Sequence, residues 1–345
     1  MTFTTIVYER FDHVARITLN RPERANALNQ TMLAEIGVAL DEAERDPQIR
    51  AVIVQGGGAA FSSGFDLKEQ MERRPTGVAE WEPILRKDFD SVMRFWHSPK
   101  PTIAAVRGPC LAGGFELALA CDLTIAAEDA FFGEPELKFG AGIVVMLLPW
   151  PVGPKTAKEI ILLGENRLSA ARAEAIGIVN RVIPAAKLEA TTLTVARDLA
   201  AIDPELVRRT RPAINRSFDA RGMLGALAEA LTIDLLIEGE GSPDKIQFMT
   251  IARREGLKAA LSWRDTRFPG GAAQPPGASI GALGRPAREH GLAGVQIAGP
   301  PGRHDSGASG AVAVLDRPFR ARVVGEPLYC KGCMVPERGF EPPTY

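Results

Sequence analysis

One acidic side chain, Glu116, is the only charged residue between Gly113 and Asp122. The sequence around it predicts a buried strand over Thr102–Val106 and a helix over Phe115–Cys121, joined by a turn of small residues. A strand that leads into a helix in this way leaves backbone N–H groups free at the positive end of the helix dipole. Such a turn suits an oxygen that becomes negative during a reaction. A structural role, in which Glu116 only complements the helix N-terminus, explains its position equally well.

Further motifs lie on both sides of this stretch and follow a fixed order. AFSSGFDLK occupies Ala60–Lys68, after the strand at residues 51–55, and FFGEPEL occupies Phe131–Leu137. Together with LNRP at Leu19–Pro22, NALN at Asn26–Asn29 and the segment Leu168–Pro184, they resemble the crotonase (enoyl-CoA hydratase/isomerase) superfamily. The resemblance extends from Phe3 to about Phe268, and it depends on the ordered set because each motif alone is weak.

The resemblance implies an acyl-CoA-processing enzyme. In that family two backbone N–H groups hold the thioester oxygen while it carries enolate charge, and the matching positions here are Phe65 and Gly113. Glu116 and Glu136 match the two glutamates that act as acid and base in hydratases, which implies syn hydration or dehydration. Glu134 does not fall on the motif position, and we expect it to have at most a supporting polar role.

The same resemblance assigns the binding positions. Ala25, Ala27 and Lys68 are expected to contact coenzyme A, with Lys68 near the nucleotide phosphates or adenine, although a solvated surface lysine is the alternative. The residues expected to line the acyl pocket are Ile143, Val144 and Met146. We expect no metal and no cofactor other than the CoA thioester of the substrate, because the histidines lack metal-ligand spacing.

The loop after Glu136 departs from the family pattern. Hydratases usually carry a glycine-rich, proline-containing loop there, whereas this chain has the bulky apolar run Ile143–Leu148. Bulky residues should shrink or dry the space for the catalytic water. Two alternatives to hydration therefore stay open: an enoyl-CoA double-bond isomerase in which one glutamate carries the proton, and a non-catalytic acyl-CoA-binding scaffold.

The elements that must position these residues follow an α/β pattern, in which strands and helices alternate to about Ile183. Residues 70–83 are charged and are predicted to be a mobile surface segment. The predicted elements are a hairpin of Thr5–Tyr8 with Val14–Leu19, a helix over Met32–Ala43, a doubly buried strand over Ala51–Val54, a helix over Ile84–His97 and a strand over Leu123–Ala127.

The resemblance specifies the fold class further, as a crotonase-type ββα spiral core with a C-terminal helical trimerisation region. We expect the core and acyl-CoA site in residues 1–200, and helices that cover the site and build a homotrimer or a dimer of trimers in residues 201–268. Leu231, Leu235 and Ile237 are the apolar residues expected at that interface, with a solvated helix face as the alternative.

Residues 269–345 differ in composition from the rest, since about a third of them are Gly or Pro. This composition predicts a disordered tail, and we interpret it as a fused or readthrough extension without function. Its Cys330–Cys333 pair is a lone CxxC motif, which lacks the partners that a four-ligand zinc site needs.

Composition excludes several other classes of function. The chain has 345 residues with 41 Lys and Arg against 42 Asp and Glu, so it offers no basic surface for nucleic acid. No apolar run reaches the length of about 18 residues that a membrane span needs, and the N-terminus lacks the pattern of a signal peptide. Four cysteines indicate a reducing compartment, and we expect a cytoplasmic protein.

Overall fold

A computed structural model describes residues 2–268 of the chain, and the predicted tail and its CxxC motif lie outside the described residues. The framework is a six-stranded sheet in the order β1-β2-β3-β4-β6-β9, in which only the β1–β2 pair is antiparallel. The mixed α/β fold class is therefore confirmed. The strands of this sheet are β1 (Ile6–Phe11), β2 (Val14–Leu19), β3 (Ala51–Gly56), β4 (Thr102–Val106), β6 (Leu123–Ala127) and β9 (Arg181–Ile183).

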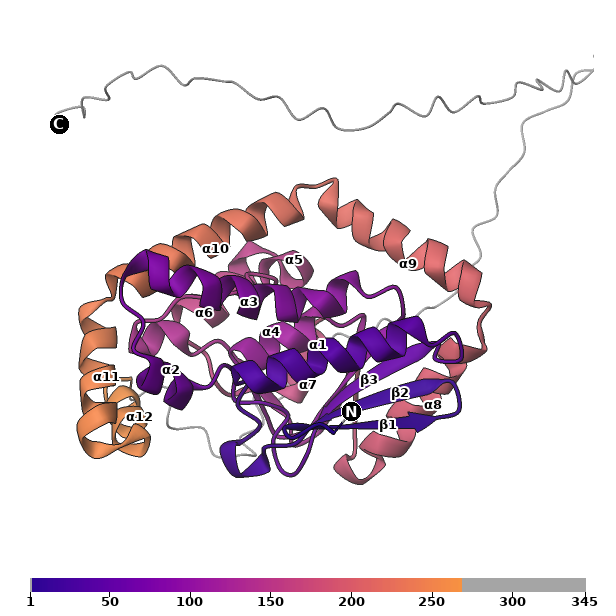
Figure 1. Cartoon of the computed structure of the whole chain (residues 1–345), viewed down its shortest axis with the longest axis horizontal. Helices are drawn as coiled ribbons and strands as arrows, with labels where there is room; N and C mark the ends of the chain where they lie inside the picture. The colour runs from indigo at the N-terminus through magenta and orange to yellow at the C-terminus, as the bar shows by residue number, and fades with distance from the viewer. Residues whose placement is uncertain (1, 269–345) are drawn as a thin grey trace, which may run out of the picture. The chain divides into compact units, whose positions relative to one another are not determined.

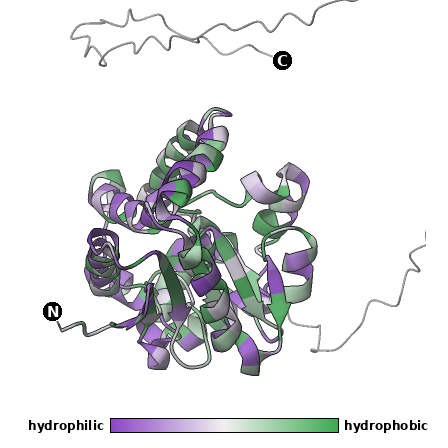
Figure 2. Ribbon diagram, turned by 90° about the vertical axis from the view of Figure 1, so that its right-hand side faces the viewer, coloured by the Kyte–Doolittle hydropathy of each residue, from purple (hydrophilic) through white to green (hydrophobic). Residues whose placement is uncertain are grey.

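Both faces of this sheet are buried, as the continuous apolar run in β3 predicts. Alternate residues point to opposite sides, so Val52 and Val54 pack with α1 (Gln30–Arg45), whereas Ile53 packs with α8 (Leu188–Ala201). Helices α3 (Gly77–His97) and α4 (Gly113–Ala120) cover the same face as α1. Figure 1 shows the helices packed on the sheet. In Figure 2 the strands are largely hydrophobic, whereas the helices carry both hydrophobic and hydrophilic residues.

A second, three-stranded sheet sets the spacing of the chemical motifs. Its order is β5-β7-β8, with β5 (Pro109–Leu111) parallel to β7 (Phe131–Gly133) and β8 (Leu168–Ser169) antiparallel to β7. The segment before α2 (Leu67–Arg73) pairs with β5, since the N–H of Leu111 donates to the carbonyl of Ser62 at 3.0 Å. This pairing brings the three motifs around residues 65, 113 and 134 to one side of the core.

The region after Ala201 is helical, as predicted, and consists of α9 (Pro204–Asp219), α10 (Met223–Glu240), α11 (Pro243–Glu255) and α12 (Leu257–Thr266). Helix α10 packs on α3, while α11 contacts the short 3₁₀ helix η2 (Glu136–Phe139) and α12 (Figure 1). Leu231 and Leu235, predicted at an interface between subunits, are instead buried within this chain, and Ile237 remains 38% exposed. The remaining helices are η1 (Pro22–Arg24), α5 (Pro149–Val152), α6 (Pro154–Leu162), α7 (Ala170–Ala175) and η3 (Ala185–Lys187).

Residues 70–83, predicted as a surface segment before a helix, are themselves largely helical, because α2 and the start of α3 occupy most of them. Proline inside a helix removes one backbone hydrogen bond and crowds the preceding turn. In the structure Pro83 lies inside α3, and the flanking side chains Trp81 and Leu85 are buried. Burial of these two large side chains offsets the local cost of the proline.

Arg211 connects α9 to the core through several hydrogen bonds of its side chain. Its guanidinium is largely buried and donates to Asp122 Oδ2 at 2.8 Å and to the carbonyls of Phe95 and Trp96 at 2.9 Å each. It also donates to the carbonyl of Ser98. One side chain therefore satisfies the carbonyl groups at the end of α3 and a carboxylate beside β4.

We predict that Arg211→Leu lowers the free energy of unfolding by about 2–3 kcal/mol, because buried carbonyls and Asp122 lose their donor. Urea unfolding followed by circular dichroism measures the effect. Arg107→Leu is the control, since Arg107 is 54% exposed and its pair with Asp129 lies at the surface. Equal losses in the two variants would contradict the anchoring role.

Candidate active site

Two backbone segments meet at the N-terminus of α4. Ala112 precedes the helix with φ 55° and ψ −136°, and its N–H donates to the carbonyl of Gly133 at 2.9 Å. Gly113 begins the helix, so its N–H has no acceptor within it. The N–H of Phe65 likewise makes no hydrogen bond within residues 2–268, although both of its neighbours in the chain do. Both N–H groups are therefore available to an external acceptor.

The approach of these two segments is close enough to require glycine at position 113. A Cβ atom built on Gly113 would lie 2.5 Å from Cε2 of the Phe65 ring, a distance at which something must shift. Together with the α4 dipole, two unpaired N–H groups can stabilise an oxygen that becomes negative.

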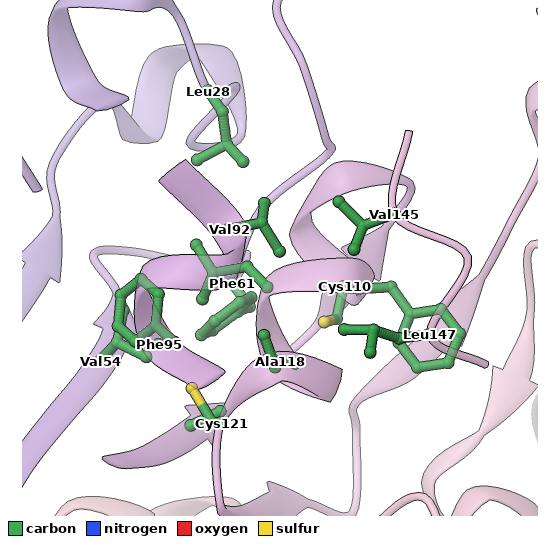
Figure 3. Packing of buried hydrophobic residues seen from close by; sticks show 14 of the residues in the cluster. Leu28, Val54, Phe61, Val92, Phe95, Cys110, Ala118, Cys121, Val145 and Leu147 are labelled. Atoms are coloured by element: carbon green, nitrogen blue, oxygen red, sulfur yellow. The ribbon is translucent and has the colours of Figure 1, made fainter. Parts of the chain in front are cut away.

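Glu116 lies in the first turn of α4 and is 1% exposed. Its Oε1 accepts a hydrogen bond from the N–H of Val145 at 3.1 Å, and its Oε2 has no partner within the described chain. Val145 belongs to the packed core and lies on the same side of the view as Leu147 (Figure 3). Burial raises the pKa of Glu116 well above its usual value, and the neighbouring Glu136 raises it further.

Glu136 is the first residue of η2, and Glu134 lies in the short segment between β7 and η2. Burial raises the pKa of Glu136 to about 8, although hydrogen bonds from its own backbone and from the Glu134 side chain oppose the rise. Burial also raises the pKa of Glu134 well above its usual value, with further contributions from Glu136 and Glu116. Since three carboxyl groups influence one another, their protons belong to the cluster rather than to single residues.

Two carboxyl groups from α10 line the same cavity as Glu136, and both were missed from the sequence. Asp234 is 2% exposed, and neither of its oxygens has a partner within the described residues. Glu238, one helical turn later on the same face, pairs with Lys245 and accepts a hydrogen bond from the N–H of Gly142 at 3.3 Å. The spacing of two acids four residues apart in an apolar helix was the available signal.

A cavity of about 710 Å³ joins these elements. Of the predicted residues, Phe65, Ala27, Lys68, Glu136 and Val144 line it, as do Ala112, Asp234 and Glu238. This volume lies within the range of small-molecule sites.

The other predicted residues are not among those that line the cavity. Gly113 and Glu116 follow the lining residue Ala112 at the start of α4. Ala25 has φ 49° and accepts the N–H of Ser63, so its backbone shapes the turn rather than the cavity surface. Ile143 is buried in the core and Met146 packs against that core, so neither lines the cavity as expected of the acyl pocket.

Within residues 2–268, no group of three or more His, Cys, Asp or Glu side chains is placed to hold a metal ion. None of the helices in this part of the chain is long and apolar enough to cross a membrane.

The mixed α/β fold is shared with a class of enzymes that act on acyl-CoA thioesters. The enoyl-CoA hydratase/isomerase family model matches residues 9–237. Because the match extends over more than half of the sequence, the chain belongs to the enoyl-CoA hydratase/isomerase family.

Individual relatives agree with this assignment. A putative enoyl-CoA hydratase from Thermus thermophilus is 42% identical over 74% of this chain and 97% of its own length. A probable enoyl-CoA hydratase from Mycobacterium bovis is 36% identical over 78% of this chain and 99% of its own. The crystal structure of an enoyl-CoA hydratase/isomerase from Xanthobacter autotrophicus Py2 is 68% identical, with a TM-score of 0.77 over 78% of this chain and all of that one.

We predict that Gly113→Ala lowers turnover of an acyl-CoA substrate by about 10²–10³-fold, because the new Cβ displaces Phe65 and with it one of the two N–H donors. Steady-state kinetics measure the loss. Gly37→Ala in α1 is the control, since a Cβ there meets no atom within 4 Å. Similar losses in both variants would show that the effect is not specific to the approach of Phe65.

Asp234 gives a prediction on pH-dependent stability. Burial raises its pKa to about 7, against the lowering effect of Lys245, so the folded chain holds a proton that the unfolded chain releases near pH 4. Stability contributed by this group is complete below pH 4 and is lost as the pH rises through 7. Asp234→Asn should therefore gain stability relative to the original chain over that window, by up to about 1.4 kcal/mol per pH unit.

Urea unfolding at several pH values between 4 and 8 tests this expectation. Asp198→Asn, at an exposed position in α8, controls for the removal of one negative charge at the surface. A difference between Asp234→Asn and the original chain that does not change with pH would contradict the prediction.

Proposed function

We propose that this chain is an enoyl-CoA hydratase that adds water to a 2-enoyl-CoA, or removes it in the reverse direction. The observation that carries the proposal is the pair of buried carboxyl groups on Glu116 and Glu136, each with an oxygen that has no partner within the described residues. Proton transfer through carboxyl groups requires such a free oxygen and a pKa shifted toward the working pH.

The thioester oxygen of the substrate accepts hydrogen bonds from the N–H groups of Phe65 and Gly113. One glutamate, as the carboxylate, takes a proton from water while the water oxygen forms a bond to C3. The electron pair of the double bond moves toward the thioester, and the resulting enolate charge is held by the two N–H donors. The other glutamate, in its protonated form, then delivers a proton to C2 on the same face, which gives syn addition.

The crowding of carboxyl groups supports this division of labour. Like charges in one buried volume disfavour ionisation of both groups, so one carboxylate and one carboxylic acid coexist near neutral pH. The Glu134 side chain opposes the rise in the pKa of Glu136 that burial causes. The reaction needs no cofactor other than the CoA thioester, which Ala25, Ala27 and Lys68 contact in this proposal.

Double-bond isomerisation is the second candidate, and one observation favours it. The apolar run Ile143–Leu148 supplies the N–H of Val145 to Glu116, and Val144 from this run lines the cavity. A dry wall beside Glu116 would allow one glutamate to move a proton between carbons without adding water.

We also propose a cytoplasmic homotrimer or dimer of trimers. Ile233, Leu236 and Ile237 of α10 are 52%, 48% and 38% exposed, which is unusual for neighbouring large apolar side chains. Burial of these side chains against a second copy of the chain would remove that apolar surface from water.

Product analysis in H₂¹⁸O separates the candidates. The full chain is incubated with 2-enoyl-CoAs of several lengths, and we expect a hydroxyacyl-CoA with ¹⁸O on its acyl chain. A shifted double bond without ¹⁸O would establish the isomerase instead, and acyl-CoA binding without any conversion would establish a binding scaffold.

Glu116→Gln and Glu136→Gln should each lower kcat by about 10²–10⁴-fold while the Kd of a saturated acyl-CoA changes little, because an amide cannot exchange the proton. Glu229→Gln, at an exposed site on α10, is the matched control. Unchanged turnover in the Glu136→Gln variant would refute the two-glutamate mechanism.

A further inference from the structure

Asp234 is a buried acid without a hydrogen-bond partner in the described chain, and it faces the substrate cavity. It lies on the face of α10 that carries the buried residues Leu231 and Leu235, and it is 2% exposed. Both of its carboxyl oxygens are buried without a partner, and Asp234 is among the residues that line the cavity. An unpaired buried carboxyl group costs several kcal/mol, so a purely structural role is a poor explanation.

The nearby cation does not remove this cost. The ammonium of Lys245 pairs with Glu238 and lies 4.2 Å from the centroid of the Trp81 ring. Glu238 also accepts the N–H of Gly142. The carboxylate of Glu238 therefore has hydrogen-bond and ion-pair partners, whereas the carboxyl oxygens of Asp234 have no hydrogen-bond partner in the described chain.

The loop after Glu136 is shaped to admit Asp234. A Cβ atom on Gly142 would lie 1.9 Å from Asp234 Oδ1, so only glycine allows the loop and the carboxyl group to approach this closely. Glu136 lies on the same cavity, and the charge of Asp234 helps to raise its pKa. Asp234 therefore lies close to the backbone of Gly142 and on the same cavity as Glu136, at the proposed reacting end of the site.

Asp88 shows the contrast within the same chain. It is also 2% exposed, but its Oδ1 accepts a hydrogen bond from Gln30 Nε2 at 2.6 Å. Asp88 does not line the 710 Å³ cavity. The buried acid outside the cavity has a protein partner, whereas the one that faces the cavity has none.

We propose that Asp234 accepts a hydrogen bond from a hydroxyl group on the acyl chain of the substrate, at a carbon beyond C3. The inference rests on the proposed function, in which the acyl group occupies this cavity. The preferred substrates are then acyl-CoAs that already carry a hydroxyl group, rather than plain fatty acyl-CoAs. A site built to bond a hydroxyl rejects the analogue that lacks it, because its own buried polar group is then left unpaired.

Affinity for saturated acyl-CoAs tests this inference without requiring turnover. Isothermal titration calorimetry with the full chain compares hexanoyl-CoA with 4-, 5- and 6-hydroxyhexanoyl-CoA. We expect at least one hydroxylated ligand to bind at least tenfold more tightly than hexanoyl-CoA. The position of its hydroxyl group then gives the distance of Asp234 along the acyl chain.

Two variants separate recognition from folding. Asp234→Leu should abolish the preference and tighten hexanoyl-CoA binding, and it should fold because it replaces an unpaired buried acid by an apolar side chain of similar size. Asp88→Asn, the matched buried acid outside the cavity, should keep the preference of the original chain.

The outcomes distinguish this inference from the function on which it rests. Equal affinity of the original chain for all four ligands would overturn the role of Asp234 and leave acyl-CoA binding intact. Failure to bind any of the four would overturn both proposals. A preference that persists in Asp234→Leu would show that another residue recognises the hydroxyl group.

Discussion

The site depends on one electrostatic constraint: several carboxyl groups share a buried volume without enough cations to neutralise them. Glu116, Glu134 and Glu136 are each almost inaccessible to solvent, and each has an oxygen that no group in the described chain satisfies. In a region of low dielectric this arrangement favours protonated forms. The packed core on both faces of the sheet offsets the free energy that the crowding costs, and the site obtains protons that can move near neutral pH.

The crowding is produced by strand pairing rather than by proximity in sequence. Glu116 and Glu136 follow β5 and β7, two short parallel strands whose ends lie side by side. The same pairing brings Phe65 to Gly113, because the segment at Ser62 hydrogen-bonds along β5. The small sheet therefore aligns the N–H donors with the carboxyl groups, and a shift in its register would separate them.

Local pattern predicted much of this arrangement, and its failures have physical causes. The strands β4 and β6 were predicted at their observed bounds, since continuous apolar runs identify doubly buried strands. The first turns of α3 were not predicted, because burial of Trp81 helps to stabilise them and that burial depends on a distant partner. The spacing of Asp234 and Glu238 is visible in the sequence, but their burial is not, because it depends on the packing of α10 on α3.

The two sides of the cavity place different demands on a ligand. The loop that contains Val144 and Val145 has apolar side chains, and the N–H of Val145 donates to Glu116. Helix α10 brings the carboxyl groups of Asp234 and Glu238 close to Gly142. A plain hydrocarbon chain would pack against the apolar loop but would leave the carboxyl group of Asp234 without a hydrogen-bond partner. A uniformly polar ligand would bond to that carboxyl group but would pack poorly against the loop. The arrangement therefore favours an acyl group that is apolar along most of its length and polar at one point.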